Sequence, residues 1–143
     1  MTLHRYLRLA VLLLLSSLAL HAEPLLRIYI RSGPKTHGPG AHDHPRFLAE
    51  WTSLLTERGA AVRGGPTFPT AEELATTDVL ILNAPEAGNI AKGDERNALE
   101  AFLQRGGGLV VLHAAAVSRD PDWYKSIIGG SWRFGTTKWL EGP

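Results

Sequence analysis

Apolar runs alternate with helix-like segments along this chain, and this alternation constrains its fold more than any other feature. Strand-like runs occupy residues 25–30, 60–63, 78–83 and 109–112. Helical spacing of apolar residues, or a helix-capping pattern, marks residues 45–58, 70–74, 94–105 and the segment that carries Trp123. An alternation of strands and helices is typical of a parallel sheet covered by helices on both faces. We therefore predict an α/β domain.

The predicted topology also indicates where a ligand would bind. Open parallel sheets bind ligands beyond the carboxyl ends of their strands. Three loops meet this condition, at residues 32–44, 83–93 and 113–122. His37, His42 and His44 lie in the first of them, and His113 directly follows the last strand. Because all strands of a parallel sheet end at one edge, we expect these four histidines to share one face of the molecule.

The segment His42-Asp43-His44 is a candidate metal or acid–base site. Neutral imidazole binds zinc and related divalent metals, and it is also the usual general acid or base near neutral pH. The positive end of the following helix disfavours a second positive charge and favours a neutral His44. We predict that His42, His44 and His113 bind a divalent metal such as zinc or act on a substrate. Solvent-exposed histidines without a role are the alternative, which we favour for His37.

His113 ends the fourth apolar run and is followed by three alanines. Small residues allow a sharp strand-to-helix turn whose amide N–H groups can bind an oxyanion. We predict His113 as a catalytic residue and Ala114 as a substrate contact, with a structural core histidine as the alternative. Asn83 and Trp123 are further substrate-binding candidates, for which turn formation and core packing are the ordinary alternatives. Asp122 is expected to cap the helix that carries Trp123.

The first 22 residues have the pattern of a secretory signal peptide. Arg5 and Arg8 precede an apolar stretch over residues 9–20, and Ala22 provides a small residue for cleavage. The apolar stretch is too short for a comfortable membrane span. We therefore predict a signal peptide over residues 1–22 and a secreted or periplasmic domain over residues 23–143, with no membrane segment after cleavage.

The charge and cysteine content exclude two classes of function. Loss of Arg5 and Arg8 leaves 13 of the 15 basic residues against 14 acidic ones. A net charge near −1 offers no electrostatic basis for binding nucleic acid. The chain has no cysteine, so an exported domain of this sequence relies on its core alone and has no thiol nucleophile.

Several of these segments together resemble the ThuA-like (trehalose utilisation) family. The resemblance rests on residues 37–40, 42–45, 106–115, 123–124 and 128–130. It extends from about residue 25 to the C-terminus, and the glycine-rich run that leads into His113 is its most specific part. It implies a flavodoxin-like three-layer sheet, similar to class I glutamine amidotransferase domains. It also implies a role in the metabolism of trehalose and related disaccharides through keto-sugar intermediates.

Glutamine hydrolysis itself is excluded. Those amidotransferases carry a cysteine nucleophile at the elbow position, where this chain has His113. Because the family continues beyond this length, and because residues 132–143 supply no closing strand, we expect a domain truncated on its C-terminal side. Further strands or a partner would then cover the exposed sheet edge.

Two functions follow from these patterns. The first is an exported carbohydrate-processing enzyme, an isomerase, lyase or hydrolase, whose histidine-rich site acts on a small-molecule carbohydrate. The alternative is a non-catalytic sugar-binding or assembly module on the same fold. A homo-oligomer is compatible with both.

Overall fold

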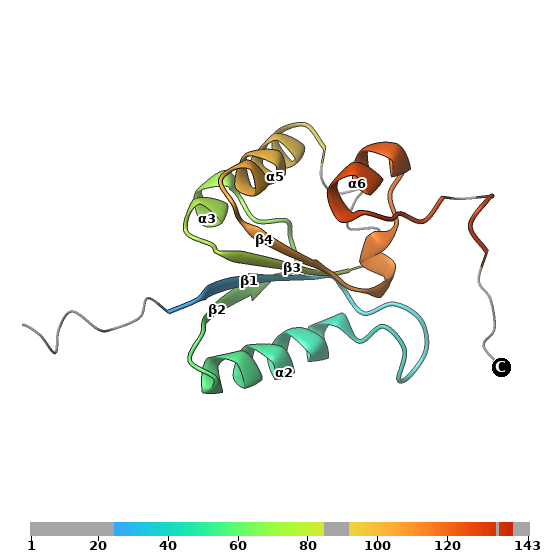
Figure 1. The fold of residues 1–143 in the computed structure, drawn as a ribbon. Helices are drawn as coiled ribbons and strands as arrows, with labels where there is room; N and C mark the ends of the chain where they lie inside the picture. The colour runs from blue at the N-terminus through green and yellow to red at the C-terminus, as the bar shows by residue number, and fades with distance from the viewer. Residues whose placement is uncertain (1–24, 85–91, 134, 139–143) are drawn as a thin grey trace, which may run out of the picture.

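In the computed structural model, the described residues, 25–84, 92–133 and 135–138, form a four-stranded parallel sheet between two helical layers (Figure 1). The strands are β1 (Arg27–Ser32), β2 (Ala61–Gly65), β3 (Val79–Asn83) and β4 (Gly108–Val111), in the order β2-β1-β3-β4. All three pairings are parallel. The predicted α/β class is thereby confirmed. The predicted signal peptide lies outside the described residues.

Helices cover both faces of the sheet, as predicted for a flavodoxin-like fold (Figure 1). One face carries α2 (His44–Glu57), and the other carries α3 (Ala71–Ala75), α5 (Asp94–Gln104) and α6 (Pro121–Ile128). A short 3₁₀ helix, η1 (His113–Ala116), follows β4 directly. Within the described ranges, no helix combines the length and the apolar character that crossing a membrane requires.

Alternation of side chains along β1 divides the core into two clusters. Ile28 and Ile30 pack with residues of α2, whereas Tyr29 packs with Leu99 and Phe102 of α5. Ile30 is fully buried. Successive side chains of a strand point to opposite faces of the sheet, so a central strand with apolar residues at both sets of positions supports a helical layer on each side.

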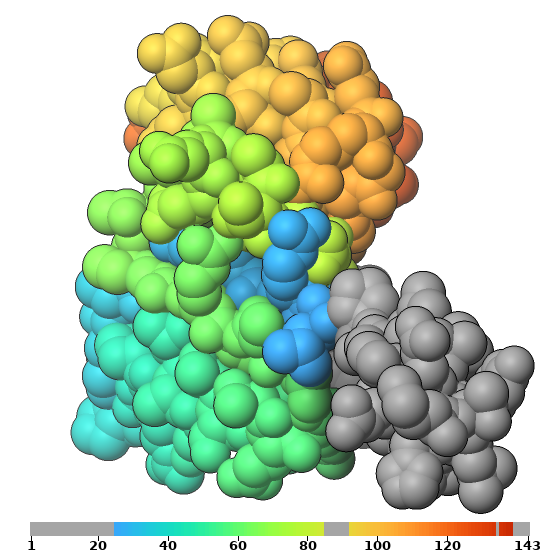
Figure 2. Space-filling view, turned by 90° about the vertical axis from the view of Figure 1, so that its left-hand side faces the viewer, coloured from blue at the N-terminus to red at the C-terminus, as the bar shows by residue number. Residues whose placement is uncertain are grey.

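The first strand begins later than the sequence predicts. Leu25 and Leu26 lie outside β1 and are 61% and 50% exposed. Figure 2 shows the end of the molecule where β1 begins, with the start of the strand between the two helical layers. Arg27 is held there by Asp78, whose Oδ2 accepts a 2.8 Å hydrogen bond from the Arg27 backbone N–H. The strand therefore begins at the residue that Asp78 holds, and the apolar character of Leu25 and Leu26 does not extend it.

One of the two predicted helix caps is confirmed and the other is not. Thr70 and Glu73 form the predicted capping box that opens α3. The prediction that Asp122 caps α6 is wrong, because the Asp120 side chain accepts the Trp123 N–H at 3.2 Å. Pro121 occupies the first turn of α6, where its missing N–H is not needed. The cap therefore precedes Pro121, and Asp122 pairs with Arg133 instead.

Candidate functional site

The four histidines of the domain lie together at the carboxyl end of the sheet. The ring of His42 is central: its centroid lies 4.4 Å from that of His37, 5.8 Å from that of His44 and 4.9 Å from that of His113. His37 and His42 come from the loop between β1 and α2, His44 opens α2, and His113 opens η1. We call this group the histidine cluster. The parallel topology thus brings together residues that are about 70 positions apart in the sequence.

His44 is the most constrained member of the histidine cluster. It is the first residue of α2 and only 3% exposed. Its Nδ1 lies 3.3 Å from the side-chain oxygen of Asn83, at the end of β3. Because an amide oxygen only accepts hydrogen bonds, this contact assigns the ring proton to Nδ1. His44 Nε2 is then a bare lone pair, buried and without a hydrogen-bond partner among the described residues.

The loop that carries His37 and His42 is held by its own hydrogen bonds. Lys35 Nζ donates to the carbonyl oxygens of Gly38 and Ala41, at 3.0 and 2.8 Å. Thr36 Oγ1 lies 3.3 Å from His42 Nδ1 and 3.1 Å from His37 Nδ1. These contacts fix the half-buried ring of His42 between its neighbours.

Left-handed backbone conformations are concentrated in the histidine cluster. His37, His42 and His113 have φ angles of 66°, 45° and 52°, and no other non-glycine residue in the described ranges has a positive φ. This conformation costs an L-residue about 1–2 kcal/mol. Such strain tends to be kept where a side chain must hold a particular direction. At the carboxyl edge of a parallel sheet, it supports a functional interpretation of these residues.

The environment favours the neutral form of His42 and His44. Burial lowers the pKa of His42, and the neighbouring histidines lower it further. Burial also lowers the pKa of His44; the Asn83 hydrogen bond partly offsets this effect, and the charge of Arg31 lowers the pKa further. Both side chains are therefore available near pH 7 as proton acceptors or metal ligands.

These pKa shifts predict that the protein is less stable at pH 5 than at pH 7.5. A histidine with a lowered pKa binds its proton more readily in the unfolded chain, so its contribution to stability is present above about pH 6.5 and is lost as the pH falls below that value. Urea denaturation of the parent should show this loss, and His44→Asn should reduce it. Asp78→Asn is the control, because Arg27 holds the pKa of Asp78 at about 2, outside this pH window. An equal pH dependence in the parent and His44→Asn would contradict the assignment.

The elbow after β4, which η1 forms, is held by a hydrogen bond from α6. The buried hydroxyl of Tyr124 donates to the carbonyl oxygen of Ala115 at 2.9 Å, and burial raises the pKa of Tyr124 to about 12. The N–H of Ala115 donates to Leu112 O at 3.0 Å, so this amide is engaged within the turn. Ala114, the predicted substrate contact, is half-buried beside the exposed His113.

Trp123 makes its contacts with α5. Its Nε1 donates to Glu100 at 2.9 Å, and the Arg96 guanidinium lies 4.2 Å from the ring centroid. The structure therefore brings Asn83 into contact with the histidine cluster and places Trp123 in the packing between two helices. A sugar-binding role for Trp123 stays a prediction.

The predicted metal site requires ring nitrogens of His42, His44 and His113 as ligands. Among the described residues, no group of three or more histidine, aspartate or glutamate side chains is arranged to hold a metal ion. His44 Nε2 is the one buried histidine nitrogen there without a hydrogen-bond partner. A metal site at the histidine cluster stays a prediction that requires the His42 and His113 rings to turn their free nitrogens toward this atom.

A cavity of about 490 Å³ lies beside β4 and α6. It is lined by residues without polar side chains, Leu109, Val111, Ala116, Ile127, Ile128 and Gly130. Ligand sites usually combine apolar walls with a few convergent polar groups. Because none of these six residues has a polar side chain, the histidine cluster is the stronger candidate for chemistry.

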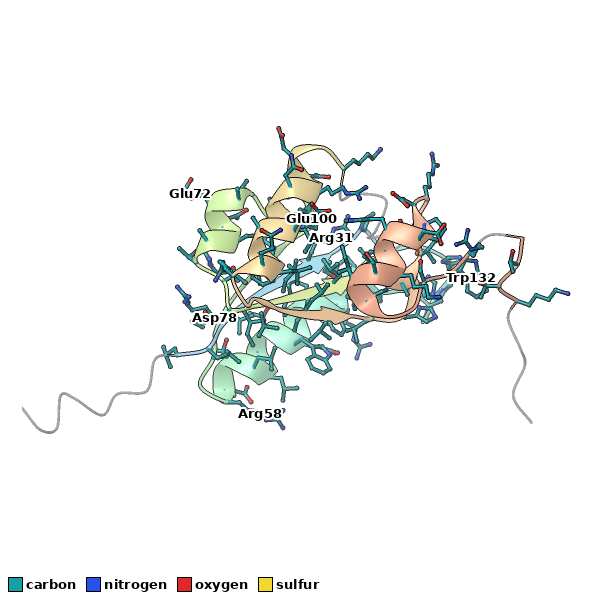
Figure 3. All side chains as sticks on the ribbon, turned by 45° about the horizontal axis from the view of Figure 1, so that its top comes forward. Arg31, Arg58, Glu72, Asp78, Glu100 and Trp132 are labelled. Atoms are coloured by element: carbon teal, nitrogen blue, oxygen red, sulfur yellow. The ribbon has the colours of Figure 1, made fainter. Side chains whose placement is uncertain are left out.

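Sequence patterns missed one residue of this region. Arg31 is a charged residue of the central strand β1, and it is buried at 6% exposure (Figure 3). The predicted apolar run ends at residue 30, so Arg31 lies just beyond it and the run gives no sign of its burial.

Comparisons with known proteins agree with this architecture. A family model described as ThuA, trehalose utilisation, matches residues 42–139. A crystal structure of a ThuA-like protein from Bacteroides uniformis is similar in fold, with a TM-score of 0.55 and 24% sequence identity. The similarity covers 76% of this chain and 45% of that protein, so this chain matches less than half of its length. No curated protein is significantly similar in sequence.

Proposed function

Because this chain belongs to the ThuA (trehalose utilisation) family, we propose that it processes a carbohydrate at the histidine cluster, within the metabolism of trehalose or related disaccharides. The observation that carries the proposal is the lone pair of His44 Nε2, which is buried and has no hydrogen-bond partner in the described structure. A buried acceptor without a partner is costly unless a ligand completes it. The proposed location is secreted or periplasmic, which the mass of the exported chain would check.

A keto-sugar is the substrate that suits these groups best. Its reaction begins with removal of a proton from the carbon beside the carbonyl, which requires a neutral base and stabilisation of the resulting enolate oxygen. In the proposed mechanism, His44 Nε2 accepts this proton, while Asn83 orients the ring through Nδ1. His113, whose ring lies next to that of His42, donates a proton to the enolate oxygen, which becomes a hydroxyl. His44 then returns its proton to the former carbonyl carbon, while the neighbouring hydroxyl gives its proton back to His113 and becomes the new carbonyl.

A divalent metal such as zinc is the second form of the same proposal. His42, His44 and His113 would hold the metal, which would act as a Lewis acid on the sugar carbonyl. His44 would then be a ligand and not a base. The two forms differ in metal content, so one measurement distinguishes them.

The test uses the full chain with trehalose and with a disaccharide that carries an oxidised, keto-form ring. We expect the keto-sugar to be consumed, and His44→Gln to lower the rate by about 10²- to 10⁴-fold, the usual contribution of a general base. His37→Gln is the matched control from the exposed side of the cluster and should retain most of the rate.

Metal analysis of the parent and a His42→Ala/His44→Ala variant decides between the two forms. Stoichiometric metal that disappears in the variant supports the ligand role, and turnover without metal supports the acid–base role. Sugar binding without turnover would instead support the non-catalytic module. Failure to bind any of these sugars would contradict the proposal.

A further inference from the structure

Arg31 is a buried cation with two guanidinium nitrogens that have no hydrogen-bond partner in the described structure. It lies near the end of β1 and is 6% exposed, and its Nε and Nη1 atoms are buried without a hydrogen-bond partner in the described part of the chain. Guanidinium remains charged under all ordinary conditions and carries five N–H donors. Burial of an unpaired charge destabilises a fold. A site that retains one therefore points to a group that pairs with it.

The position of Arg31 connects it to the candidate site. Arg31 lies two residues after Tyr29 along β1 and therefore shares its face of the sheet, the one that carries α5 and α6, as Figure 3 shows. It pairs in register with Leu82 of β3, one residue before Asn83. Its charge is also close enough to lower the pKa of His44. Arg31 and the histidine cluster therefore occupy the same carboxyl edge of the sheet.

Acidic side chains in the described structure do not neutralise Arg31. Glu95, at the start of α5, interacts with it electrostatically. The ion pairs identified in the described ranges join other residues, and none includes Arg31. Glu95 therefore interacts with the Arg31 cation without forming an ion pair with it in the described structure.

We propose that Arg31 binds an oxyanion carried by the ligand of the histidine cluster, a carboxylate or a phosphate on a sugar. This inference rests on the proposed function and makes it more specific: the preferred carbohydrate is anionic. The unpartnered Nε–H and Nη1–H can each form a planar donor pair with Nη2–H, and such a pair matches two oxygens of a carboxylate or phosphate. Arg31 is a binding residue in this proposal and takes no part in proton transfer.

The test measures binding and needs no turnover. Glucuronate, glucose 6-phosphate and inorganic phosphate are titrated into the full chain, with glucose as the neutral control, and the melting temperature and calorimetric heat are recorded. We expect at least one anion to raise the melting temperature and to bind at least tenfold more tightly than glucose. A response to glucuronate alone identifies a carboxylate, and a response to either phosphate compound identifies a phosphate.

Variants separate ligand binding from a structural role. Arg31→Met should weaken anion binding at least tenfold while raising the melting temperature of the free protein, because it removes an unpaired buried charge. Arg31→Lys keeps the charge without the planar pair of donors and should retain only part of the affinity.

Three results would overturn the inference. The first is no anion response in the parent, and the second is an anion affinity unchanged in Arg31→Met. The third is a loss of stability in Arg31→Met that Glu86→Gln reproduces; Glu86 lies outside the described residues, and this result would identify an internal ion pair. The proposed carbohydrate function can survive any of these results, because a neutral keto-sugar would still be processed at the histidine cluster.

Discussion

Phe102→Ala should lower the free energy of unfolding by about 3–5 kcal/mol, the range observed when a buried phenylalanine is truncated in a core. Phe102 is 2% exposed and belongs to the cluster that joins α5 to the sheet. Its ring also fills the space over Gly107, where an added Cβ would lie 2.4 Å from the ring edge. Truncation would therefore leave a cavity between α5 and β4 that backbone movement cannot easily close.

Urea denaturation at pH 7.5 measures this effect, with Val110→Ala as the control. Val110 lies on the edge strand β4 and is 40% exposed, so its truncation should change stability by no more than about 0.5 kcal/mol. Gly107→Ala adds a second test. It should destabilise the parent but cost less in the Phe102→Ala background, because the clashing ring is then absent. A Phe102→Ala effect close to that of Val110→Ala would contradict the packing described here.

Gly64→Ala should destabilise the protein by about 1–3 kcal/mol through overpacking. Gly64 lies in β2, in register with Ile30 of β1. An added Cβ would lie 2.5 Å from the backbone oxygen of Ile30 and 2.6 Å from Leu48 Cδ1. Leu48 can rotate, but the carbonyl of a central strand is fixed by the sheet, so β2 would have to move away from β1.

Gly38→Ala is the matched control for this substitution. An added Cβ at Gly38 meets no atom within 4 Å, and the backbone there is not left-handed. Its expected effect is close to zero or slightly stabilising, because alanine restricts the unfolded chain. Equal destabilisation by the two substitutions would show that the close approach of β1 and β2 at Gly64 is wrong.

The histidine cluster illustrates how far sequence reasoning reaches. The carboxyl-edge rule predicts that His42, His44 and His113 lie near one another, and the ring centroid distances of 5.8 and 4.9 Å agree with it. The same rule selects Asn83, which contacts His44. It does not distinguish Trp123, whose indole binds α5, because a loop position near the edge does not fix the direction of a side chain.

Sequence patterns do not identify Arg31, because its interest depends on its burial. Arg31 attracts attention only once β1 is known to be a central strand with helices on both faces, since an arginine on an edge strand would be solvated. The cap of α6 lies two residues before the predicted Asp122 for a local reason, because Pro121 takes the first turn and leaves Asp120 at the capping position.

The sequence by itself determined the alternation of strands and helices, the parallel sheet and the gathering of histidines at its carboxyl edge. These features follow from side-chain periodicity and chain connectivity, which are local properties. Only the tertiary structure decided the strand order β2-β1-β3-β4, the left-handed backbone of three histidines and, within the described residues, the lack of hydrogen-bond partners for Arg31 Nε, Arg31 Nη1 and His44 Nε2. Each of these depends on contacts between distant residues, because burial and hydrogen-bond partners are set by what packs against a residue and not by its neighbours in the chain.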